Sequence, residues 1–168
     1  MKTRLATKDD LPGLYRLFAG AVAELRRGKI FIWDDVYPAC VLESDIESGG
    51  LYVMEENGEL TAAFALCDIN ECEGSIDWID NFARALFIYR LAVDTRYLHQ
   101  GVGSLALREA AREAKLRGAE YLRLLVGDVN VPAVRLYEKN GFSLAKGTFK
   151  KVVSPEITLR ELGYEIKT

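Results

Sequence analysis

The chain has 168 residues, 49% of them hydrophobic and 28% charged, and its formal net charge is −3. These values are typical of one globular domain, which we expect over residues 1–168, and they exclude a disordered chain. The charged N-terminus lacks the apolar centre of a signal peptide, and no apolar run is long enough to span a bilayer. We therefore predict a cytoplasmic protein without a membrane partner.

The first half of the chain predicts two helices followed by a hairpin. The expected elements are a strand over 3–7, a helix over 11–28, an irregular aromatic segment over 30–38, a short helix over 39–50, a hairpin over 51–68 and a polar loop over 69–84. Asp9 or Asp10 can cap the first helix, and Gly28 ends it. The pair Asn57-Gly58 is a strong type I′ turn signal, which predicts the hairpin.

The second half predicts one strand–helix–strand unit and a final pair of strands. The expected elements are a buried strand over 85–93, a helix over 103–117, a strand over 120–127, a helix over 130–141 and two strands over 142–153 and 157–167. A strand–helix–strand connection is usually a right-handed crossover between parallel strands. We therefore predict an α/β fold with a mixed, mostly antiparallel sheet, a central parallel strand–helix–strand unit and helices on both faces.

Charge is unevenly distributed along the chain. Residues 30–82 contain thirteen acids and no Lys or Arg, whereas the chain from Ala83 onward has fifteen Lys and Arg against nine acids. A solvated acidic face explains most of these acids. The same asymmetry suits a protein that attracts a cationic partner to one part of its surface and an anionic partner to another. No dense basic stripe interleaved with aromatic residues is present, so nucleic acid is not an expected partner.

The cysteine and histidine content excludes two kinds of site. An odd number of cysteines, Cys40, Cys67 and Cys72, predicts free thiols. The sole histidine is His99, and no Cys/His cluster accompanies it, so no metal site is expected. A serine triad would have to use this same histidine as its base.

Two glycines, Gly101 and Gly103, lie between a buried strand and the start of a helix. Backbone N–H groups from Gln100 to Ser104 would point in one direction there, and the helix dipole adds partial positive charge. Such a terminus can bind phosphate, and glycine lets the backbone approach the ligand closely. The loop alone indicates either a phosphate site or a structural turn. A Walker A loop is excluded, and a single strand–helix–strand unit fits a dinucleotide-binding fold poorly.

Three residues of the next helix form a second pattern. Asn130, Ala133 and Tyr137 are spaced i, i+3 and i+7, so they share one helix face. A polar cap, a small residue and a phenol in a row suit a groove wall that ends in a hydroxyl. The same three residues also suit a helix cap, a packing position and a half-buried core ring.

The two patterns together resemble the GNAT superfamily of N-acetyltransferases. The phosphate loop of that family, Gln/Arg-x-x-Gly-x-Gly/Ala, corresponds to "LHQGVG" over 98–103, with Leu98 in place of Gln or Arg. The family's Asn-x-x-Ala-x-x-Leu-Tyr…Gly-Phe motif matches "NVPAVRLYEKNGF" over 130–142 at every named position. The stretch "RLAV" over 90–93 resembles the family's strand that pairs with pantetheine.

The resemblance implies direct transfer of an acetyl group from acetyl-CoA to a primary amine in a ternary complex, without a metal. It implies acetyl-CoA contacts from Leu91, Ala92, Val93, His99, Gln100, Gly101, Val102, Gly103, Ser104, Asn130, Ala133 and Tyr137. Two of these residues are expected to be catalytic. The Leu91 amide would donate to the oxygen on which charge develops, and Tyr137 would protonate the departing CoA thiolate.

The resemblance also implies that the loop between the first two helices shapes the acceptor site. The expected acceptor contacts are Trp33, Asp34, Tyr37 and Tyr89, with Arg90 as a further candidate. A carboxylate is the simplest base for removing the amine proton. The sequence leaves that base open among Asp34, Asp35, Glu71, Glu73 and Asp77.

Two other functions stay open at this point. One is a catalytically silent module that binds acyl-CoA, and the other is an enzyme that acetylates a protein N-terminus or lysine. The acidic segment favours a cationic acceptor. The oligomeric state is undecided, with a homodimer as one candidate.

Overall fold

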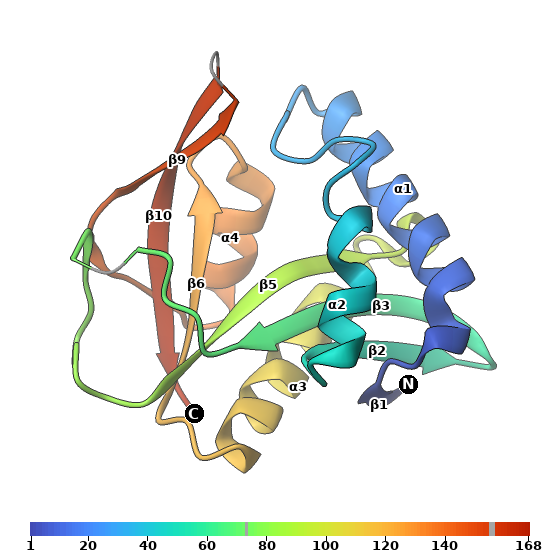
Figure 1. Cartoon of the computed structure of the whole chain (residues 1–168), viewed down its shortest axis with the longest axis horizontal. Coiled ribbons are helices and arrows are strands. Elements are labelled where there is room, and N and C mark those ends of the chain that lie inside the picture. The colour runs from blue at the N-terminus through green and yellow to red at the C-terminus, as the bar shows by residue number, and fades with distance from the viewer. Residues whose placement is uncertain (73, 155–156) are drawn as a thin grey trace. The chain divides into compact units, whose positions relative to one another are not determined.

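The computed structural model describes residues 1–72, 74–154 and 157–168, and Figure 1 labels most of their helices and strands. They form two compact units. Unit 1 comprises Met1–Leu66 and Tyr89–Glu109, and unit 2 comprises Cys67–Ile88 and Ala110–Thr168. Strand β5 (Ala85–Val93) passes from unit 2 into unit 1, and helix α3 (Val102–Leu116) passes back. The predicted single domain over 1–168 stays a prediction.

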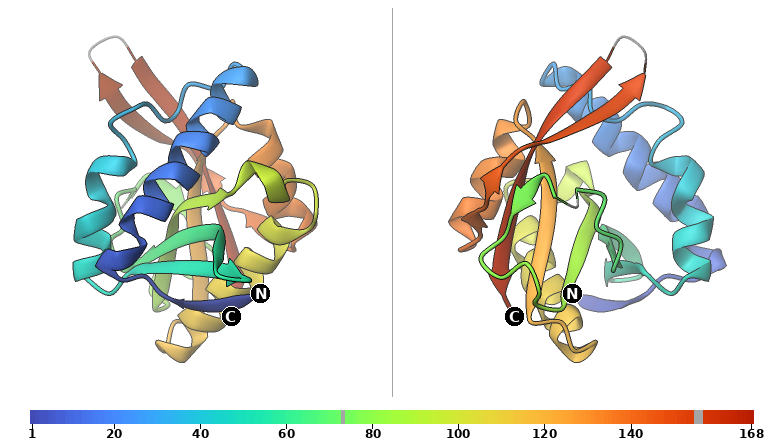
Figure 2. Two further views of the ribbon diagram at one scale, coloured as in Figure 1. Left: turned by 90° about the vertical axis from the view of Figure 1, so that its right-hand side faces the viewer. Right: turned by 60° about the vertical axis from the view of Figure 1, so that its left-hand side comes forward.

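Unit 1 is a set of strands with helices on both faces. Its elements are β1 (Lys2–Leu5), α1 (Leu11–Arg27), α2 (Leu42–Glu47), β2 (Leu51–Glu56), β3 (Glu59–Cys67), the end of β5 and the start of α3. The strand order is β1-β2-β3-β5, and β2 is antiparallel to both of its neighbours. Figure 2 shows α1 and α2 against one face of β2 and β3.

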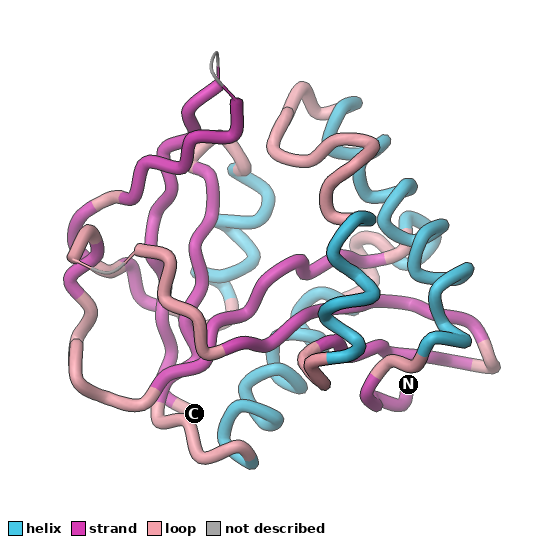
Figure 3. Tube along the Cα trace, in the orientation of Figure 1, coloured by secondary structure: helices cyan, strands magenta, loops and turns pink. Residues whose placement is uncertain are grey.

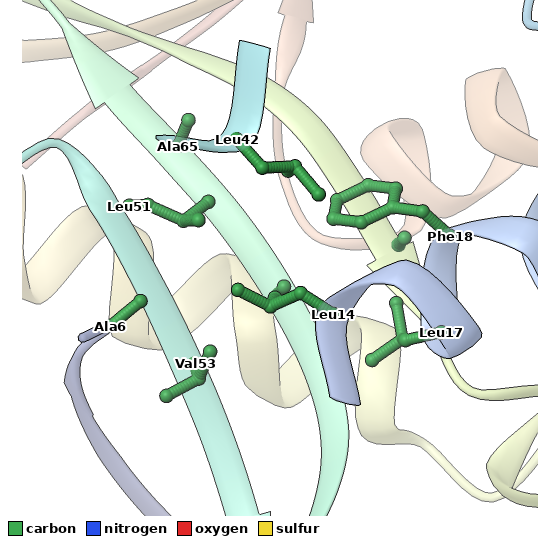
Figure 4. Packing of buried hydrophobic residues seen from close by; sticks show 10 residues of the cluster. Ala6, Leu14, Leu17, Phe18, Leu42, Leu51, Val53 and Ala65 are labelled. Carbon is green, nitrogen blue, oxygen red and sulfur yellow. The ribbon is translucent and has the colours of Figure 1, made fainter. Parts of the chain in front are cut away.

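The core of unit 1 follows from the alternation of side chains along its strands. Leu51 and Val53 of β2 and Ala63 and Ala65 of β3 point to the face that carries α1 and α2. There they meet Leu14, Leu17 and Phe18 of α1 and Leu42 of α2, as Figure 4 shows. Small alanines on β3 leave room for the large side chains of α1. This packing fixes α1 above the strands.

Unit 2 is built around the parallel strand pair. Its elements are the start of β5, β4 (Ile76–Asp77), β6 (Tyr121–Gly127), α4 (Val131–Lys139), β7 (Ser143–Leu144), β8 (Lys146–Gly147), β9 (Phe149–Ser154) and β10 (Ile157–Lys167). Ala85–Phe87 of β5 pair in parallel with Tyr121–Arg123 of β6. Strand β10 is antiparallel to β6, β7 and β9. The predicted mixed α/β fold with one parallel unit is therefore confirmed.

Most of the segment between β3 and β5 is loop, as Figure 3 shows. It packs closely on β10 at Gly163, where an added Cβ would lie 2.9 Å from the Trp78 ring and 2.8 Å from Ile76. Only glycine permits that approach without a shift of these side chains. The loop is thus seated on β10 by close packing.

Local signals predicted several element ends correctly. Asn57 and Gly58 both have positive φ, as a type I′ turn requires. Gly118, at φ +80°, follows α3, and the Asn130 side chain caps α4 by accepting the Ala133 N–H across 3.4 Å. Asp10 occupies the N-cap position of α1, as predicted, but its carboxylate binds Arg4 and makes no capping hydrogen bond there.

Two other element predictions were wrong in detail. The expected strand over 142–153 is divided among β7, β8 and β9, because Gly147 takes a left-handed conformation and β8 pairs with β4. The expected helix over 39–50 contains one turn of 3-10 helix, Ala39–Val41, followed by α2. Strand β4 was missed because two residues show no periodicity.

Candidate functional site

The glycine loop of unit 1 joins the end of β5 to the start of α3. Residues Thr95–Tyr97 form a turn of 3-10 helix, and His99 (φ +61°) and Gly101 (φ +82°) then take left-handed conformations. Helix α3 begins at Val102, and its first i→i−4 bond runs from the Leu105 N–H to the Gly101 carbonyl. The first amides of a helix have no acceptor within the helix, so this end of α3 suits an anion. A Cβ at Gly101 would lie in open space.

Hydrogen bonds and ion pairs within unit 1 hold this loop in place. Asp94 accepts the Arg96 backbone N–H across 2.9 Å, and its own N–H donates to the Thr61 carbonyl across 2.9 Å. The Arg96 guanidinium bridges Asp94 and Glu59. Gln100 donates its side-chain amide back to the Arg96 carbonyl across 2.8 Å. The Gln100 side chain is thus engaged within the loop, which leaves its backbone as the part that could contribute to the predicted phosphate site.

The predicted pantetheine contacts, Leu91 to Val93, lie at the end of β5, beside the hydrophobic core of unit 1. Ala92 is buried in that core, whereas Leu91 and Val93 are half-buried. Burial of the Ala92 side chain leaves its backbone as the part that can meet a ligand. Arg90, immediately before them, has φ +52°, which is rare for a residue other than glycine.

An open pocket of about 490 Å³ lies between α1 and the loop that follows it. The α1 side is mainly apolar, and the loop side includes Asp34, Asp35, Pro38 and Ala39. Oδ1 of Asp34 accepts the backbone N–H groups of Val36 (2.8 Å) and Tyr37 (2.7 Å), which lowers the pKa of this carboxyl. Asp34 is therefore a fixed carboxylate at the rim of an apolar pocket.

The predicted acceptor contacts divide into two groups within unit 1. Trp33 packs on Phe18, with ring centroids 5.8 Å apart, and so extends the hydrophobic core of unit 1. Tyr37 and Tyr89 instead meet Arg90. The Tyr37 hydroxyl accepts from Arg90 Nη1 across 3.3 Å, and the guanidinium lies 5.5 Å from the centre of the Tyr89 ring. The structure thus brings Tyr37 and Tyr89 together through Arg90.

Sequence reasoning missed Asp45, the main partner of Arg90. Arg90 Nε and Nη2 donate to Asp45 Oδ2 and Oδ1, each across 2.7 Å. A usable signal was present, because a buried strand that carries one arginine needs a buried acceptor for it. The sequence does not show which of thirteen acids supplies that acceptor.

Helix α4 of unit 2 carries the second predicted pattern. Asn130 is its cap, and Ala133 is half-buried. The Tyr137 ring is buried beside Phe142 and Tyr164, with ring centroids 5.9 and 6.3 Å away. Burial raises the pKa of Tyr137 to about 12. Among the described residues no protein group hydrogen bonds its hydroxyl, so the phenol keeps its proton at neutral pH and can donate it.

Most of the predicted bases have structural partners. Asp35 pairs with Arg26 across 3.0 Å, Glu71 pairs with Lys151 across 2.9 Å, and Asp77 accepts from Asn81. Glu73 lies outside the described residues. Of the two predicted carboxylates that line the pocket, Asp35 is held in its ion pair with Arg26, whereas Asp34 accepts only loop amides among the described residues, although its lowered pKa makes it a weak base.

Glu161 of β10 is a carboxylate that the sequence did not single out. Its Oε2 atom is buried without a hydrogen-bond partner among the described residues. Burial raises its pKa, and Lys151 opposes that effect. A carboxylate in this state accepts a proton more readily than an exposed one. Its position within an alternating strand gave no signal of this property.

Folding removes most of the charge asymmetry seen along the chain. Unit 1 carries ten Lys and Arg against thirteen acids, and unit 2 carries twelve of each. Ion pairs join acids of the 30–82 segment to basic residues outside it, as in Glu55–Arg4, Glu47–Lys8 and Glu59–Arg96. Attraction of a cationic acceptor would therefore depend on local carboxylates such as Asp34.

The cysteines, the possible metal ligands and the helices of the described residues bear on other kinds of site. Cys40, Cys67 and Cys72 form no disulfide, and burial raises the pKa of Cys72 to about 11, so that thiol is unreactive at neutral pH. Within residues 1–72, 74–154 and 157–168, no group of three or more His, Cys, Asp or Glu side chains could hold a metal ion. No helix in the same ranges is long and apolar enough to cross a bilayer.

Comparison with known proteins gives a family match and several structural matches. The model of the acetyltransferase (GNAT) family matches residues 18–142. No curated protein matches the chain. A GNAT-family acetyltransferase from Streptococcus agalactiae superposes with a TM-score of 0.84 at 21% identity, covering 99% of this chain and 95% of that one.

Two further structures bear on the ligand and the acceptor. The Salmonella typhimurium protein yncA, solved with its cofactor acetyl-CoA, matches with a TM-score of 0.68 at 20% identity, over 99% of this chain and 92% of that one. A ribosomal-protein-alanine N-acetyltransferase from Brucella melitensis matches with a TM-score of 0.71 at 21% identity, over the full length of both chains. At these identities the likeness shows the fold.

Proposed function

The chain belongs to the acetyltransferase (GNAT) family, and from this premise we propose that it transfers the acetyl group of acetyl-CoA directly to a primary amine. The observation that carries the proposal is the loop between β5 and α3. Its left-handed residues, His99 and Gly101, turn the backbone into the start of α3, and the space that a Cβ at Gly101 would occupy is open. The pyrophosphate of CoA is an anion that such a loop can hold.

The residues present fit acetyl-CoA as co-substrate. Backbone amides near Gly101 and Gly103 would hold the pyrophosphate, so replacement of the family's Gln or Arg by Leu98 removes only a side-chain contribution. The backbone of Leu91, Ala92 and Val93 would pair with pantetheine. When bound, acetyl-CoA supplies an activated thioester, and the rest of the chemistry belongs to the protein.

We place the stabilisation of the developing negative charge at the Leu91 N–H. A fixed amide that donates to the carbonyl oxygen lowers the barrier most where charge appears during reaction, by about 3 kcal/mol. The residue before Leu91 is Arg90, whose positive φ departs from regular strand geometry. The Leu91 N–H therefore follows a local change in the direction of the backbone.

Tyr137 supplies the proton for the departing sulfur. Its pKa of about 12 keeps the phenol protonated at neutral pH, and its hydroxyl has no competing protein partner among the described residues. A hydrogen bond from this phenol to the sulfur stabilises negative charge as the bond to the acyl carbon breaks. The neighbouring Phe142 and Tyr164 rings hold its orientation.

The acceptor amine is proposed to bind beside the loop that follows α1. The open pocket there joins an apolar wall of α1, which includes Phe18 and Val22, to the fixed carboxylate of Asp34. This combination suits an amine that carries an apolar body. Asp34 would accept its proton, directly or through water.

An amine panel tests the proposal. Release of CoA thiol is measured with neutral aryl amines, polyamines and peptides with free N-termini, while acetyl-CoA binding is measured by calorimetry. We expect turnover with at least one amine class and a preference for cationic amines, which Asp34→Asn should weaken. Asparagine keeps the Oδ1 acceptor for the loop amides, so this variant changes charge alone.

The panel also separates the two other functions. Binding of acetyl-CoA without turnover on any amine would support a silent acyl-CoA-binding module. Turnover on peptides alone would support a protein acetyltransferase, the activity named for the Brucella protein. Preference for acidic or neutral acceptors would contradict the proposed role of Asp34.

A further inference from the structure

Strand β5 contains one residue whose backbone departs from the strand. Arg90 has φ +52°, in the left-handed region that favours glycine, although its neighbours continue the strand to Val93. A residue with a long side chain keeps this conformation only where its surroundings impose it. The Arg90 side chain has contacts that can impose it.

Those contacts come from two segments that are distant in sequence. Arg90 donates two hydrogen bonds of 2.7 Å to the two carboxylate oxygens of Asp45 on α2. A third, of 3.3 Å, reaches the Tyr37 hydroxyl in the loop before α2. The Arg90 and Asp45 side chains are only 12% and 16% exposed, so water screens the pair weakly. A bidentate pair of this kind fixes direction as well as distance.

The backbone of Arg90 determines where the next amide points. The Leu91 N–H belongs to the peptide group that follows the Arg90 Cα, so rotation about the Arg90 backbone bonds turns this N–H. Holding the guanidinium from α2 limits that rotation.

We propose that Asp45 is a positioning residue, which through its paired hydrogen bonds to Arg90 holds the left-handed turn of β5 and thereby aims the Leu91 N–H. The inference rests on the proposed function, in which that N–H donates to the thioester carbonyl. It assigns a task in the reaction to a side chain that itself touches no substrate. An amide misdirected by a fraction of an ångström loses much of its effect on the barrier.

Two variants and one control test the hydrogen bonds between Asp45 and Arg90. Asp45→Asn replaces one acceptor oxygen by an amide that faces an N–H donor, which breaks one of the two bonds. The double variant Asp45→Asn/Arg90→Gly leaves no unpaired charge and places glycine at φ +52°, so it guards against loss of folding. Glu47→Gln is the matched control, because it removes an exposed ion pair with Lys8 from the same helix.

Two measurements decide the inference. In ¹H–¹⁵N spectra of the protein without ligand, the Leu91 amide resonance should move in both Asp45 variants and stay in place in Glu47→Gln. In steady-state kinetics, both Asp45 variants should lose roughly tenfold or more in kcat, while KM for acetyl-CoA changes less than about twofold. A merely structural pair would lower the melting temperature and leave kcat of the folded fraction unchanged.

Three other outcomes would contradict the inference or the proposed function. An unmoved Leu91 resonance overturns the inference whatever the kinetics show. A moved resonance with kcat equal to that of Glu47→Gln overturns the role in the reaction. A wild-type protein that neither binds acetyl-CoA nor turns over any amine overturns the proposed function first, and the inference with it.

Discussion

Arg123 of β6 and Glu165 of β10 form an ion pair in the interior of unit 2, with Nε donating to Oε2 across 3.2 Å and both side chains less than 5% exposed. The same guanidinium donates to the Asp80 carbonyl and lies 4.8 Å from the centre of the Trp78 ring. Glu165 Oε1 accepts the Ile79 N–H across 2.6 Å. The pair thus ties the loop before β5 to two strands.

Removing one member of that pair should destabilise the protein strongly. Arg123→Leu leaves the Glu165 carboxylate buried without its cation, and we expect a loss of about 3–5 kcal/mol in the free energy of unfolding. The double variant Arg123→Leu/Glu165→Leu should lose much less, because no buried charge remains. Urea unfolding of the wild type and both variants measures this. Equal losses in the single and double variants would contradict the explanation.

A side chain at Gly101 should abolish acetyl-CoA binding. Gly101→Glu places a carboxylate in the open space beside the amides that would hold the pyrophosphate, and we expect affinity to fall tenfold or more, about 1.4 kcal/mol at least. Gly58→Glu is the matched control, since Gly58 has the same φ of +82° and open space around its Cβ position, in the turn between β2 and β3. Calorimetry with acetyl-CoA provides the comparison. Tight binding by Gly101→Glu would refute the assigned phosphate position.

Loss of the Tyr137 hydroxyl should slow turnover without weakening acetyl-CoA binding. Tyr137→Phe keeps the ring contacts with Phe142 and Tyr164, and we expect kcat to fall roughly 100-fold, as for a lost general acid. Tyr164→Phe is the control, because that hydroxyl is already bonded to Glu138 across 3.0 Å. Steady-state rates and calorimetry on both variants test this. Equal kcat in Tyr137→Phe and the wild type would remove Tyr137 from the mechanism.

Acid should weaken unit 1 through Asp10. The Arg4 guanidinium holds the pKa of this carboxyl at about 2, below its ordinary value of 3.8. The unfolded chain therefore takes up the proton first as pH falls, and stability present above pH 4 is lost between about pH 4 and 2. We expect a loss of about 1–2 kcal/mol there, smaller in Asp10→Asn. Unfolding measured at several pH values gives the slope, and parallel curves for the two proteins would disprove this.

The sequence predicted features that depend on neighbouring residues. The turn at Asn57-Gly58, the cap at Asn130 and the start of α3 after Gly101 each follow from local backbone preferences. The phosphate loop and the α4 face could be found for the same reason. Their spacing is short, and their residue types are restricted.

Pairs that join distant segments could not be predicted in this way. Asp45 is one of many acids in its segment, and only the folded chain brings it within 2.7 Å of Arg90. Glu161 occupies an ordinary strand position, and its state depends on burial under residues far away in sequence. The charge asymmetry along the chain does not show which acids stay unpaired, because folding pairs residues such as Glu55 with Arg4.

The central claim is transfer of acetyl from acetyl-CoA to an amine. The most direct measurement incubates the wild-type protein with acetyl-CoA labelled in its acetyl group and a library of amines, and follows the label by mass spectrometry. The proposal predicts labelled N-acetyl product and an equal amount of free CoA, both greatly reduced in Tyr137→Phe. Binding of acetyl-CoA without labelled product from any amine would contradict it.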